Sequence, residues 1–178
     1  PSAVPLFYRV GVGQLCQADS VQMLGADSSG EVEPVVVAAG GELLLTIGSD
    51  HTDRKVEAYS VAVSKQMCAK PLARAAWRLA EVVGHWDRLI IRSFIAENGE
   101  RVRYQEGPLS GMCTTADLIG RYTGGATTLP EGTVMFCGTV GAIGGVRPSS
   151  RFEFEIEDPV LGRRISAGYD IVTLPVVA

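Results

Sequence analysis

A chain of 178 residues, 46% of them hydrophobic, is long enough to form one domain with a sizeable core. Its 16 basic and 20 acidic residues give a formal net charge of −4. This balance argues against a nucleic-acid partner, because proteins that bind nucleic acids normally present a basic face. No apolar run approaches the roughly 20 residues of a membrane span, so we expect no membrane partner either.

The four cysteines are scattered along the chain, with no CxxC pair and no close histidine. They are Cys16, Cys68, Cys113 and Cys137. This pattern fits reduced thiols in the core of a cytoplasmic protein better than a disulfide framework or a zinc knuckle. We expect residues 1–178 to form a single domain. Because the chain begins at Pro1 without methionine, we also expect that a leading segment is missing.

The first thirty residues predict short strands and loops. Residues Val4–Leu15 mix apolar residues with glycine, which is typical of a strand followed by a loop. A second short strand is expected at Val21–Leu24. The glycine, aspartate and serine content of Gly25–Gly30 favours a loop.

A β-hairpin is the clearest feature of the first half of the chain. Its strands are expected at Glu31–Ala38 and Glu42–Ser49, separated by the Gly-Gly pair at residues 40–41. Two glycines suit the primed turn that joins twisted antiparallel strands. A turn centred on this pair sets Ala39 opposite Glu42 and so fixes the register of the whole hairpin.

In that register, three carboxylates meet at the open end of the hairpin. Glu31 and Glu33 are two residues apart and leave the same face of the strand. Asp50 lies opposite Glu31, and directly opposed side chains share a face with their Cβ atoms about 5 Å apart. Three anions this close repel one another unless a cation or protons intervene. An all-oxygen cluster suits Mg²⁺, Mn²⁺ or Ca²⁺ rather than zinc.

Spacing alone leaves a second interpretation open, which is a solvated acidic strand end. A hairpin loop of odd length would shift the register by one residue and place Asp50 on the other face. Pro34 lacks an N–H group, which fits an edge strand or a gap in the ladder better than a central strand.

The middle of the chain predicts one helix and a second hairpin. Pro71–Val83 has a proline in its first turn, apolar residues at helical spacing and a glycine directly after it, so we expect a helix. Asp87–Ile95 is expected to be a strand. The Asn98-Gly99 pair then predicts a tight turn into a further strand at Arg101–Gln105.

The last third of the chain predicts a short helix followed by strands. Thr114 or Thr115 can cap a helix that ends near Tyr122. Further strands are expected at Thr133–Cys137, at Arg151–Glu157, where phenylalanine and isoleucine alternate with charged residues, and at Asp170–Leu174. Strands dominate and no βαβ alternation is present, so the fold class is mainly β with some α.

Several segments, taken in order, resemble the fumarylacetoacetate hydrolase-like superfamily, and an uncharacterised branch of it most closely. The superfamily has an E-x-E pair on a strand, then an N-D-x-[ST]-x-R segment, then a lysine shortly followed by proline. A short helix, a Pro-Gly turn and a strand ending in Gly-Thr come later. The matching segments here are Ser29–Glu33, Ser49–Arg54 (with Ser49 in place of Asn), Ser64–Pro71, Thr115–Ile119 and Leu129–Thr139.

The resemblance implies a compact roll of mixed β-sheets of the fumarylacetoacetate hydrolase C-terminal domain type, usually as a homodimer. It also implies that Glu31, Glu33 and Asp50 are the ligands of one Mg²⁺ or Mn²⁺. The hairpin register leads to the same three residues by an independent route, which favours the metal site over the solvated strand end.

The activity implied by the resemblance is a metal-dependent hydrolysis of a C–C bond in a 2-oxo or β-diketo acid, such as an acylpyruvate, through a metal-bound enolate. Lys65 occupies the position of a lysine that donates a charged hydrogen bond to the substrate; without the motif, a solvated surface lysine would explain it. Gly138 and Thr139 match a pair beside the substrate, although a strand-end turn would also account for them. Arg54 would either contact substrate or pair with a carboxylate.

One feature of the superfamily is missing. Hydrolytic members bring a His–Glu pair from a mobile N-terminal segment to activate water, whereas residues 1–30 contain neither type. His51 could serve as a general base because its ordinary pKa suits neutral pH, but next to Asp50 on a strand it would point to the opposite face. We expect His85 to be structural. A lyase or isomerase acting on 2-oxo acids, or a non-catalytic binding protein, therefore remain alternatives to the hydrolase.

Overall fold

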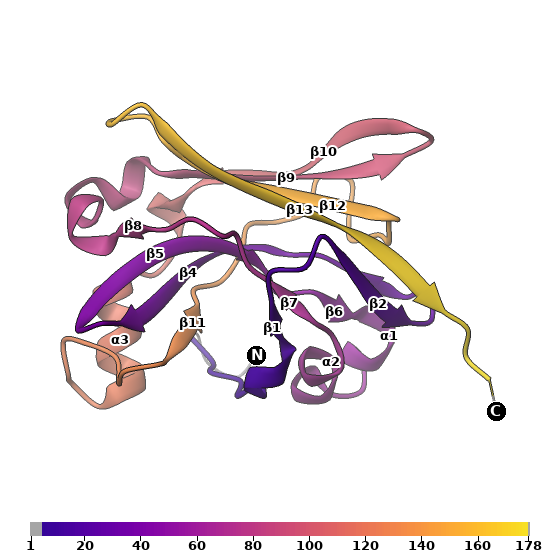
Figure 1. Cartoon of the computed structure of the whole chain (residues 1–178), viewed down its shortest axis with the longest axis horizontal. Coiled ribbons are helices and arrows are strands. Elements are labelled where there is room, and N and C mark those ends of the chain that lie inside the picture. The colour runs from indigo at the N-terminus through magenta and orange to yellow at the C-terminus, as the bar shows by residue number, and fades with distance from the viewer. Residues whose placement is uncertain (1–4, 178) are drawn as a thin grey trace.

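The computed structural model describes residues 5–177, so Val4, the first residue of an expected strand-and-loop segment, lies outside the described residues. Two β-sheets form the two layers of the molecule (Figure 1). The first has five strands in the order β10 (Glu100–Pro108), β9 (Ile90–Glu97), β12 (Arg151–Asp158), β13 (Arg163–Leu174) and β2 (Ser20–Leu24). The second has four, in the order β11 (Val134–Phe136), β4 (Val32–Ala39), β5 (Glu42–Ser49) and β8 (Trp77–Arg78).

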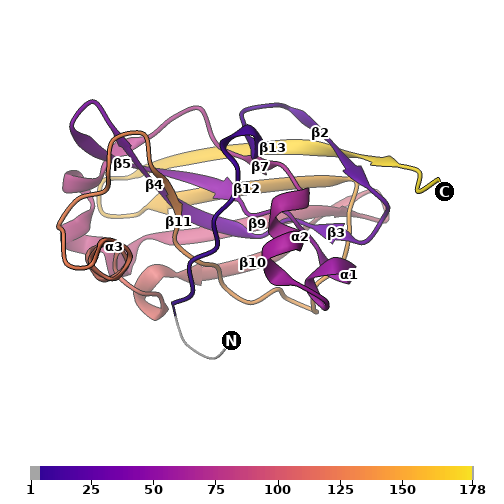
Figure 2. The ribbon, with the colours of Figure 1, turned by 90° about the horizontal axis from the view of Figure 1, so that it is seen from below.

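Small elements close one side of the four-stranded sheet. Two short strand pairs are present: β1 (Leu15–Cys16) with β7 (Lys70–Pro71), and β3 (Ser28–Ser29) with β6 (Thr52–Asp53). The α-helices are α1 (Arg54–Glu57), α2 (Val61–Met67) and α3 (Thr115–Thr123). Four 3₁₀-helices, η1 to η4, span Val12–Gln14, Leu79–Glu81, Val83–Arg88 and Leu109–Gly111. Seen from below, the N-terminal segment crosses this side between β11 and α2 (Figure 2). Within residues 5–177, no helix has the length and apolar character needed to cross a membrane.

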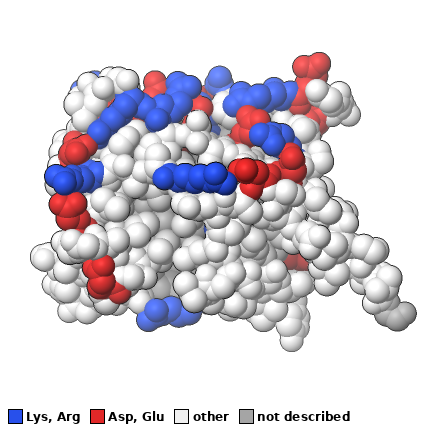
Figure 3. Space-filling model, in the orientation of Figure 1, with Lys and Arg blue, Asp and Glu red and all other residues white. Residues whose placement is uncertain are grey.

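The outer face of the five-stranded sheet is covered by alternating charges. In Figure 3 the acidic and basic side chains gather over this sheet. Arg92 of β9 pairs with Glu106 of β10 and with Glu155 and Glu157 of β12. These strands therefore show the period-two pattern that the sequence predicts for Arg151–Glu157, with charged residues outside and Phe152, Phe154 and Ile156 inside.

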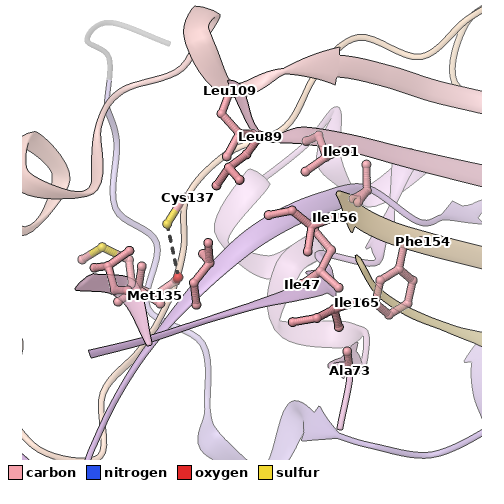
Figure 4. Packing of buried hydrophobic residues seen from close by; sticks show 14 of the residues in the cluster. Ile47, Ala73, Leu89, Ile91, Leu109, Met135, Cys137, Phe154, Ile156 and Ile165 are labelled. Atoms are coloured by element: carbon pink, nitrogen blue, oxygen red, sulfur yellow. Dashed lines mark hydrogen bonds between the residues drawn. The ribbon is translucent and has the colours of Figure 1, made fainter. Parts of the chain in front are cut away.

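The inner faces of the two sheets form the hydrophobic core. Figure 4 shows Ile47 of β5 beside Ile156 of β12 and Ile165 of β13. All three side chains are buried. Burying apolar surface between the layers supplies the main driving force for this arrangement, and the mainly β fold class predicted from the sequence is confirmed.

The first hairpin has the predicted register. Ala39 pairs with Glu42 and Glu33 pairs with Gly48, and both turn glycines, Gly40 and Gly41, have positive φ as a primed turn requires. The second hairpin, between β9 and β10, turns at Asn98 and Gly99, also with positive φ.

Pro34 lies in a central strand, since β4 runs between β11 and β5. The pairing with β11 ends at Val35, directly before Pro34 is reached. At Pro34 itself, the carbonyl accepts a hydrogen bond from Cys137 N at 3.0 Å. A proline is therefore tolerated at the gap that the sequence analysis anticipated.

The helix predicted for Pro71–Val83 is wrong. This segment instead runs along the edge of β5. Ala73 N donates to Ile47 O at 2.9 Å, and Trp77, in β8, pairs with Leu45 of β5. The apolar residues at helical spacing do not form one buried face, because Leu79 is buried whereas Ala75, Ala76 and Val83 are exposed. The segment is extended as far as β8 and continues in short 3₁₀ turns, a case in which tertiary pairing overrides helix propensity.

The other boundaries shift modestly. Helix α3 is capped by the Thr114 hydroxyl and is followed by Gly124 with φ 75°, close to the prediction. The last strand, β13, begins seven residues earlier than expected, at Arg163. Helices α1 and α2 were not predicted; they are four and seven residues long and too short for a clear periodic signal.

Candidate metal centre

The hairpin brings the three predicted carboxylates together. Glu31 precedes β4, Glu33 lies within it, and Asp50 follows β5 directly. A hydrogen bond of 2.9 Å from Asp50 N to Glu31 O extends the hairpin by one residue beyond the last strand pair. As a result, one carboxylate oxygen from each residue lies within 4.8 Å of the other two.

Burial makes this cluster electrostatically costly without a cation. Glu33 and Asp50 are only 6% and 7% exposed. Burial, with repulsion from Asp50 and Glu31, raises the pKa of Glu33 to about 8. Burial also raises the pKa of Glu31, although Arg54 and Lys65 oppose that shift. The site therefore favours either a bound proton or a bound cation.

Two lysines contact Asp50, one at each oxygen of its carboxylate. The Lys65 ammonium, carried by α2, donates to Asp50 Oδ2 and lies 3.8 Å from Glu31 Oε2. The Lys70 ammonium, carried by β7, lies 3.0 Å from Asp50 Oδ1 and donates to the His51 carbonyl at 2.5 Å. Burial by itself would lower the pKa of Lys65, but Asp50, Glu31 and Glu33 together outweigh burial and raise this pKa. For Lys70 burial prevails, and its pKa is lowered.

The oxygen atoms present fit a hard divalent cation. Asp50 Oδ1 is buried without a well-aligned hydrogen bond, and its negative charge is compensated by the ion pair with the Lys70 ammonium at 3.0 Å. This ion pair leaves a lone pair of the oxygen available, which a metal ion would use. The atoms of this cluster that could coordinate a metal are carboxylate oxygens, which suit Mg²⁺, Mn²⁺ or Ca²⁺.

The Arg54 side chain is bound by carboxylates. It begins α1, and its Nη1 lies 3.3 Å from Glu31 Oε1 and 2.9 Å from Glu57 Oε2. Its Nε donates to Ser29 Oγ at 2.7 Å. Of the two roles considered from the sequence, the contacts match carboxylate pairing, and Arg54 thereby orients Glu31.

Gly138 contacts the metal cluster through its backbone. Its N–H donates to Glu33 Oε2 at 2.7 Å, with φ at 96°. A positive φ of this size is readily adopted by glycine and strained for other residues. Strand β11 ends at Phe136, so Gly138 lies just beyond the strand rather than at its end.

The hydroxyl of Thr139 is already used within the protein. It donates to Val32 O at 2.6 Å and accepts from Gln105 Nε2 at 2.8 Å. Gly138 borders the cavity described below, whereas Thr139 is not among its lining residues. Through these contacts Thr139 helps to hold β4, the strand that carries Glu33.

Gln105 is a buried residue that sequence reasoning missed. It is 1% exposed and lies at an irregularity in the β9–β10 pairing. Its Oε1 accepts from Val32 N at 3.0 Å, and its Nε2 donates to Thr139 Oγ1 and to Val140 O. Gln105 thus ties the residue between the two glutamate ligands to the loop after β11. The sequence offers no local signal for this, because the partners lie 34 to 73 residues away.

Lys70 is the second functional candidate that the sequence analysis did not single out, although it lies within the Ser64–Pro71 motif. A signal was available, since Lys70 is one of only three lysines in the chain and directly precedes Pro71. Its burial, at 2% exposed, could not be foreseen.

His51 faces away from the carboxylates, as its strand position predicts. It is fully buried, and its ring nitrogens lie 2.7 Å from the Tyr169 hydroxyl and 2.9 Å from Ser28 Oγ. Burial, with the positive charge of Lys70, lowers the pKa of His51 to about 3. His85 lies 3.0 Å from buried Asp158, a contact in keeping with its expected structural role.

A cavity of about 310 Å³ adjoins the carboxylate cluster. Glu33, Asp50, Lys65 and Lys70 form its polar end. The N-terminal segment at residues 6–11 and parts of β11 and α3 complete its wall. The arrangement therefore offers a carboxylate cluster and a charged lysine at one end of a space that fits a small molecule.

Solved structures of several enzymes share this fold. Cg1458 is 20% identical, with a TM-score of 0.65 over 88% of this chain and 65% of that chain. A 2-keto-3-deoxy-D-arabinonate dehydratase complexed with magnesium and 2,5-dioxopentanoate is 17% identical, with a TM-score of 0.67 over 90% of this chain and 59% of that chain. A 2-hydroxyhepta-2,4-diene-1,7-dioate isomerase from Mycobacterium marinum is 17% identical, with a TM-score of 0.60 over 86% of this chain and 63% of that chain.

The chain spans less than two thirds of the length of these solved structures. At such low identity the likeness establishes the fold and not the activity. A search of curated proteins finds no match. Residues 1–169 match the family described as "Protein of unknown function (DUF2848)". The chain therefore belongs to this family, and its fold is that of the fumarylacetoacetate hydrolase-like superfamily, as the sequence motifs indicate.

Proposed function

We propose that this protein is a divalent-metal-dependent enzyme that acts on a small 2-oxo acid by stabilising its enolate form. The observation that carries the proposal is the convergence of Glu31, Glu33 and Asp50 beside the charged Lys65 at the polar end of a cavity. The magnesium complex of a 2-keto acid dehydratase with the same fold supports the proposal.

The three carboxylates would hold Mg²⁺ or Mn²⁺. When bound, the metal would act as a Lewis acid and contribute several kcal/mol to the stabilisation of negative charge on the substrate. The three carboxylates and the ammoniums of Lys65 and Lys70 carry a net charge of −1 when all are ionised. A divalent cation would make this charge +1, which matches the single carboxylate of a 2-oxo acid.

Lys65 is proposed to donate a hydrogen bond to the substrate. Its raised pKa keeps the ammonium protonated at neutral pH, so it serves as a donor rather than as a base. Its bond to Asp50 fixes the ammonium at the cavity wall. Arg54 and the Gly138 N–H would orient Glu31 and Glu33 without touching the substrate.

Hydrolysis of a C–C bond is the reaction implied by the resemblance, and it requires a group that activates water. His51 is hydrogen-bonded to Tyr169 and Ser28 and does not line the cavity. We therefore propose a structural role for His51. This geometry favours a second candidate, a lyase or isomerase that acts on the same enolate without a water-activating histidine.

A substrate panel tests both candidates. Purified protein with Mg²⁺ or Mn²⁺ should change the ultraviolet absorbance of at least one acylpyruvate or other 2-oxo acid, and Glu33→Gln should abolish the change. Incorporation of solvent oxygen into a new carboxylate identifies hydrolysis, whereas release of CO₂ identifies decarboxylation. Saturable binding by calorimetry with no product would replace the enzyme by a non-catalytic binding protein.

We also propose that the protein forms a homodimer, as members of the superfamily usually do. Light scattering coupled to size-exclusion chromatography should give about twice the 18.9 kDa mass of one chain. A mass equal to one chain at micromolar concentration would contradict this proposal.

A further inference from the structure

The cavity has a second charged position, at Arg9. This residue lines the same space as Glu33 and Asp50. Its guanidinium carbon lies 5.1 Å from the centroid of the Tyr122 ring, a cation–π contact. Among residues 5–177, no carboxylate lies within ion-pair distance of Arg9, whereas both lysines of the cavity are paired with Asp50.

The segment that carries Arg9 is held at both ends. Phe7 packs against Tyr122 of α3 with ring centroids 5.4 Å apart. Gly11 N donates to Gln66 Oε1 on α2 at 2.9 Å. The segment thus passes from α3 to α2 (Figure 2), and Arg9 lies in the chain between these two contacts.

Apart from its charged residues, the lining of the cavity is mainly apolar. Leu15, Val134, Met135 and Phe136 belong to it, and the side-chain hydroxyls in the lining are those of Tyr8, Tyr122 and Thr133. A mainly apolar wall favours a hydrocarbon spacer over a heavily hydroxylated chain, because burying a hydroxyl without a partner costs free energy. The volume of about 310 Å³ limits the ligand to a small molecule.

We propose that the substrate is a 2-oxo acid with a second carboxylate at the far end of a short hydrocarbon spacer, and that Arg9, supported by Tyr122, binds this second carboxylate. The inference rests on the proposed function for the other end of the substrate. A guanidinium presents a planar fork that matches a carboxylate. One positive charge balances one carboxylate, whereas a phosphate dianion would leave a negative charge without a partner.

Two isosteric ligand pairs test the inference. Manganese-loaded protein is titrated by calorimetry with 2-oxoglutarate against 2-oxopentanoate, and with 2-oxoadipate against 2-oxohexanoate. Each pair differs only by a terminal carboxylate in place of a methyl group. Since Arg9 is an exposed residue, we expect the dicarboxylate of at least one pair to bind roughly fivefold more tightly at low salt. This preference should shrink in 0.5 M NaCl, because salt screens exposed charges.

Variants assign the preference to Arg9. Arg9→Gln should remove it while leaving the affinity for oxalate, which occupies only the metal end, unchanged. Arg88→Gln is the matched control, because Arg88 is exposed and lies outside the cavity. Equal affinities within both pairs in the wild-type protein, or a preference that survives Arg9→Gln, would overturn the inference.

Oxalate separates this inference from the proposed function. If manganese-loaded protein binds oxalate but shows no dicarboxylate preference, only the role of Arg9 is lost. If oxalate fails to bind while an Arg9-dependent preference persists, the proposed metal function is lost and the anion site at Arg9 stands. Failure of both measurements overturns both proposals.

Discussion

Glu33 is the least exposed of the three carboxylate residues. Its folded-state pKa of about 8 lies above the ordinary value of 4.5, so the metal-free fold holds an additional proton between these values. The free energy of unfolding of the metal-free protein is therefore expected to fall as the pH rises from 4.5 towards 8. A divalent cation would displace this proton, and metal affinity should rise over the same range.

Glu33→Gln should weaken metal binding and stabilise the metal-free protein. The amide oxygen can still accept the bond from Gly138 N, while the buried negative charge is removed. We expect Mn²⁺ affinity to fall at least about tenfold. The free energy of unfolding should exceed that of the wild type by on the order of 1–3 kcal/mol at pH 8.5, with a smaller difference at pH 5.5.

Calorimetry and urea denaturation at the two pH values measure these effects. Glu42→Gln, at the exposed turn end of the same hairpin, is the matched control and should change neither quantity appreciably. An unchanged metal affinity in Glu33→Gln would contradict the assignment of Glu33 as a ligand.

Lys65→Met should separate turnover from metal binding. The substitution removes the ammonium beside Asp50 and Glu31, so the affinity for Mn²⁺ should stay equal or increase. Turnover of an active 2-oxo acid should fall about 10²-fold or more, because a charged hydrogen-bond donor to the developing enolate is lost. Lys55→Met is the control, since Lys55 is exposed on α1. Turnover equal to that of the wild type would exclude the proposed role.

At the scale of elements, the ligand hairpin depends on a distant strand for its position. The start of β4 is held by Gln105 of β10 and by the loop after β11, through the Val32 backbone. In this way the two sheets are connected at the residue between the two glutamates, and the carboxylate cluster lies where β4, β10 and the loop after β11 meet.

Gln105→Leu should loosen this junction. The substitution leaves Val32 N, Thr139 Oγ1 and Val140 O without their present partner. Each buried unsatisfied group costs about 1–3 kcal/mol, so we expect a loss of at least about 2 kcal/mol in the free energy of unfolding. Mn²⁺ affinity should also fall. A lower metal affinity would show that Gln105 positions the carboxylates, in addition to stabilising the fold. Gln22→Leu, on an exposed position of β2, should leave both unchanged. Wild-type metal affinity in a folded Gln105→Leu variant would argue against positioning.

At the scale of the whole molecule, metal binding should raise thermal stability, because a ligand that binds only the folded state stabilises it by mass action. At a Mn²⁺ concentration one hundred times the dissociation constant the gain is about 2.7 kcal/mol. For a chain of this size that corresponds to a rise in Tm of roughly 5–10 °C. Differential scanning fluorimetry with Mn²⁺, and again after addition of EDTA, measures it. A metal site at the hairpin would be contradicted if the Tm changed with neither Mn²⁺ nor EDTA. It would also be contradicted if Mn²⁺ raised the Tm of Glu33→Gln as much as that of the wild type.

Local chemistry was sufficient to predict both hairpins and the capped helix α3. Gly40, Gly41, Asn98 and Gly99 set the turns, and period two sets which side chains share a face. The meeting of Glu31, Glu33 and Asp50 follows from these two rules, because the three residues are joined by one turn. The superfamily motifs added the position of Lys65.

Only the tertiary structure decided the rest, because the deciding contacts join residues far apart in the chain. Residues 71–78 are extended rather than helical because β5 offers them an edge to pair with, and short 3₁₀ turns follow. Lys70 and Gln105 acquire their places from partners that no local pattern identifies, and Arg9 reaches the cavity because its segment packs between α3 and α2. The sequence by itself determined the meeting of the three carboxylates, which are joined by one hairpin, whereas burial and long-range packing determined the cavity beside them.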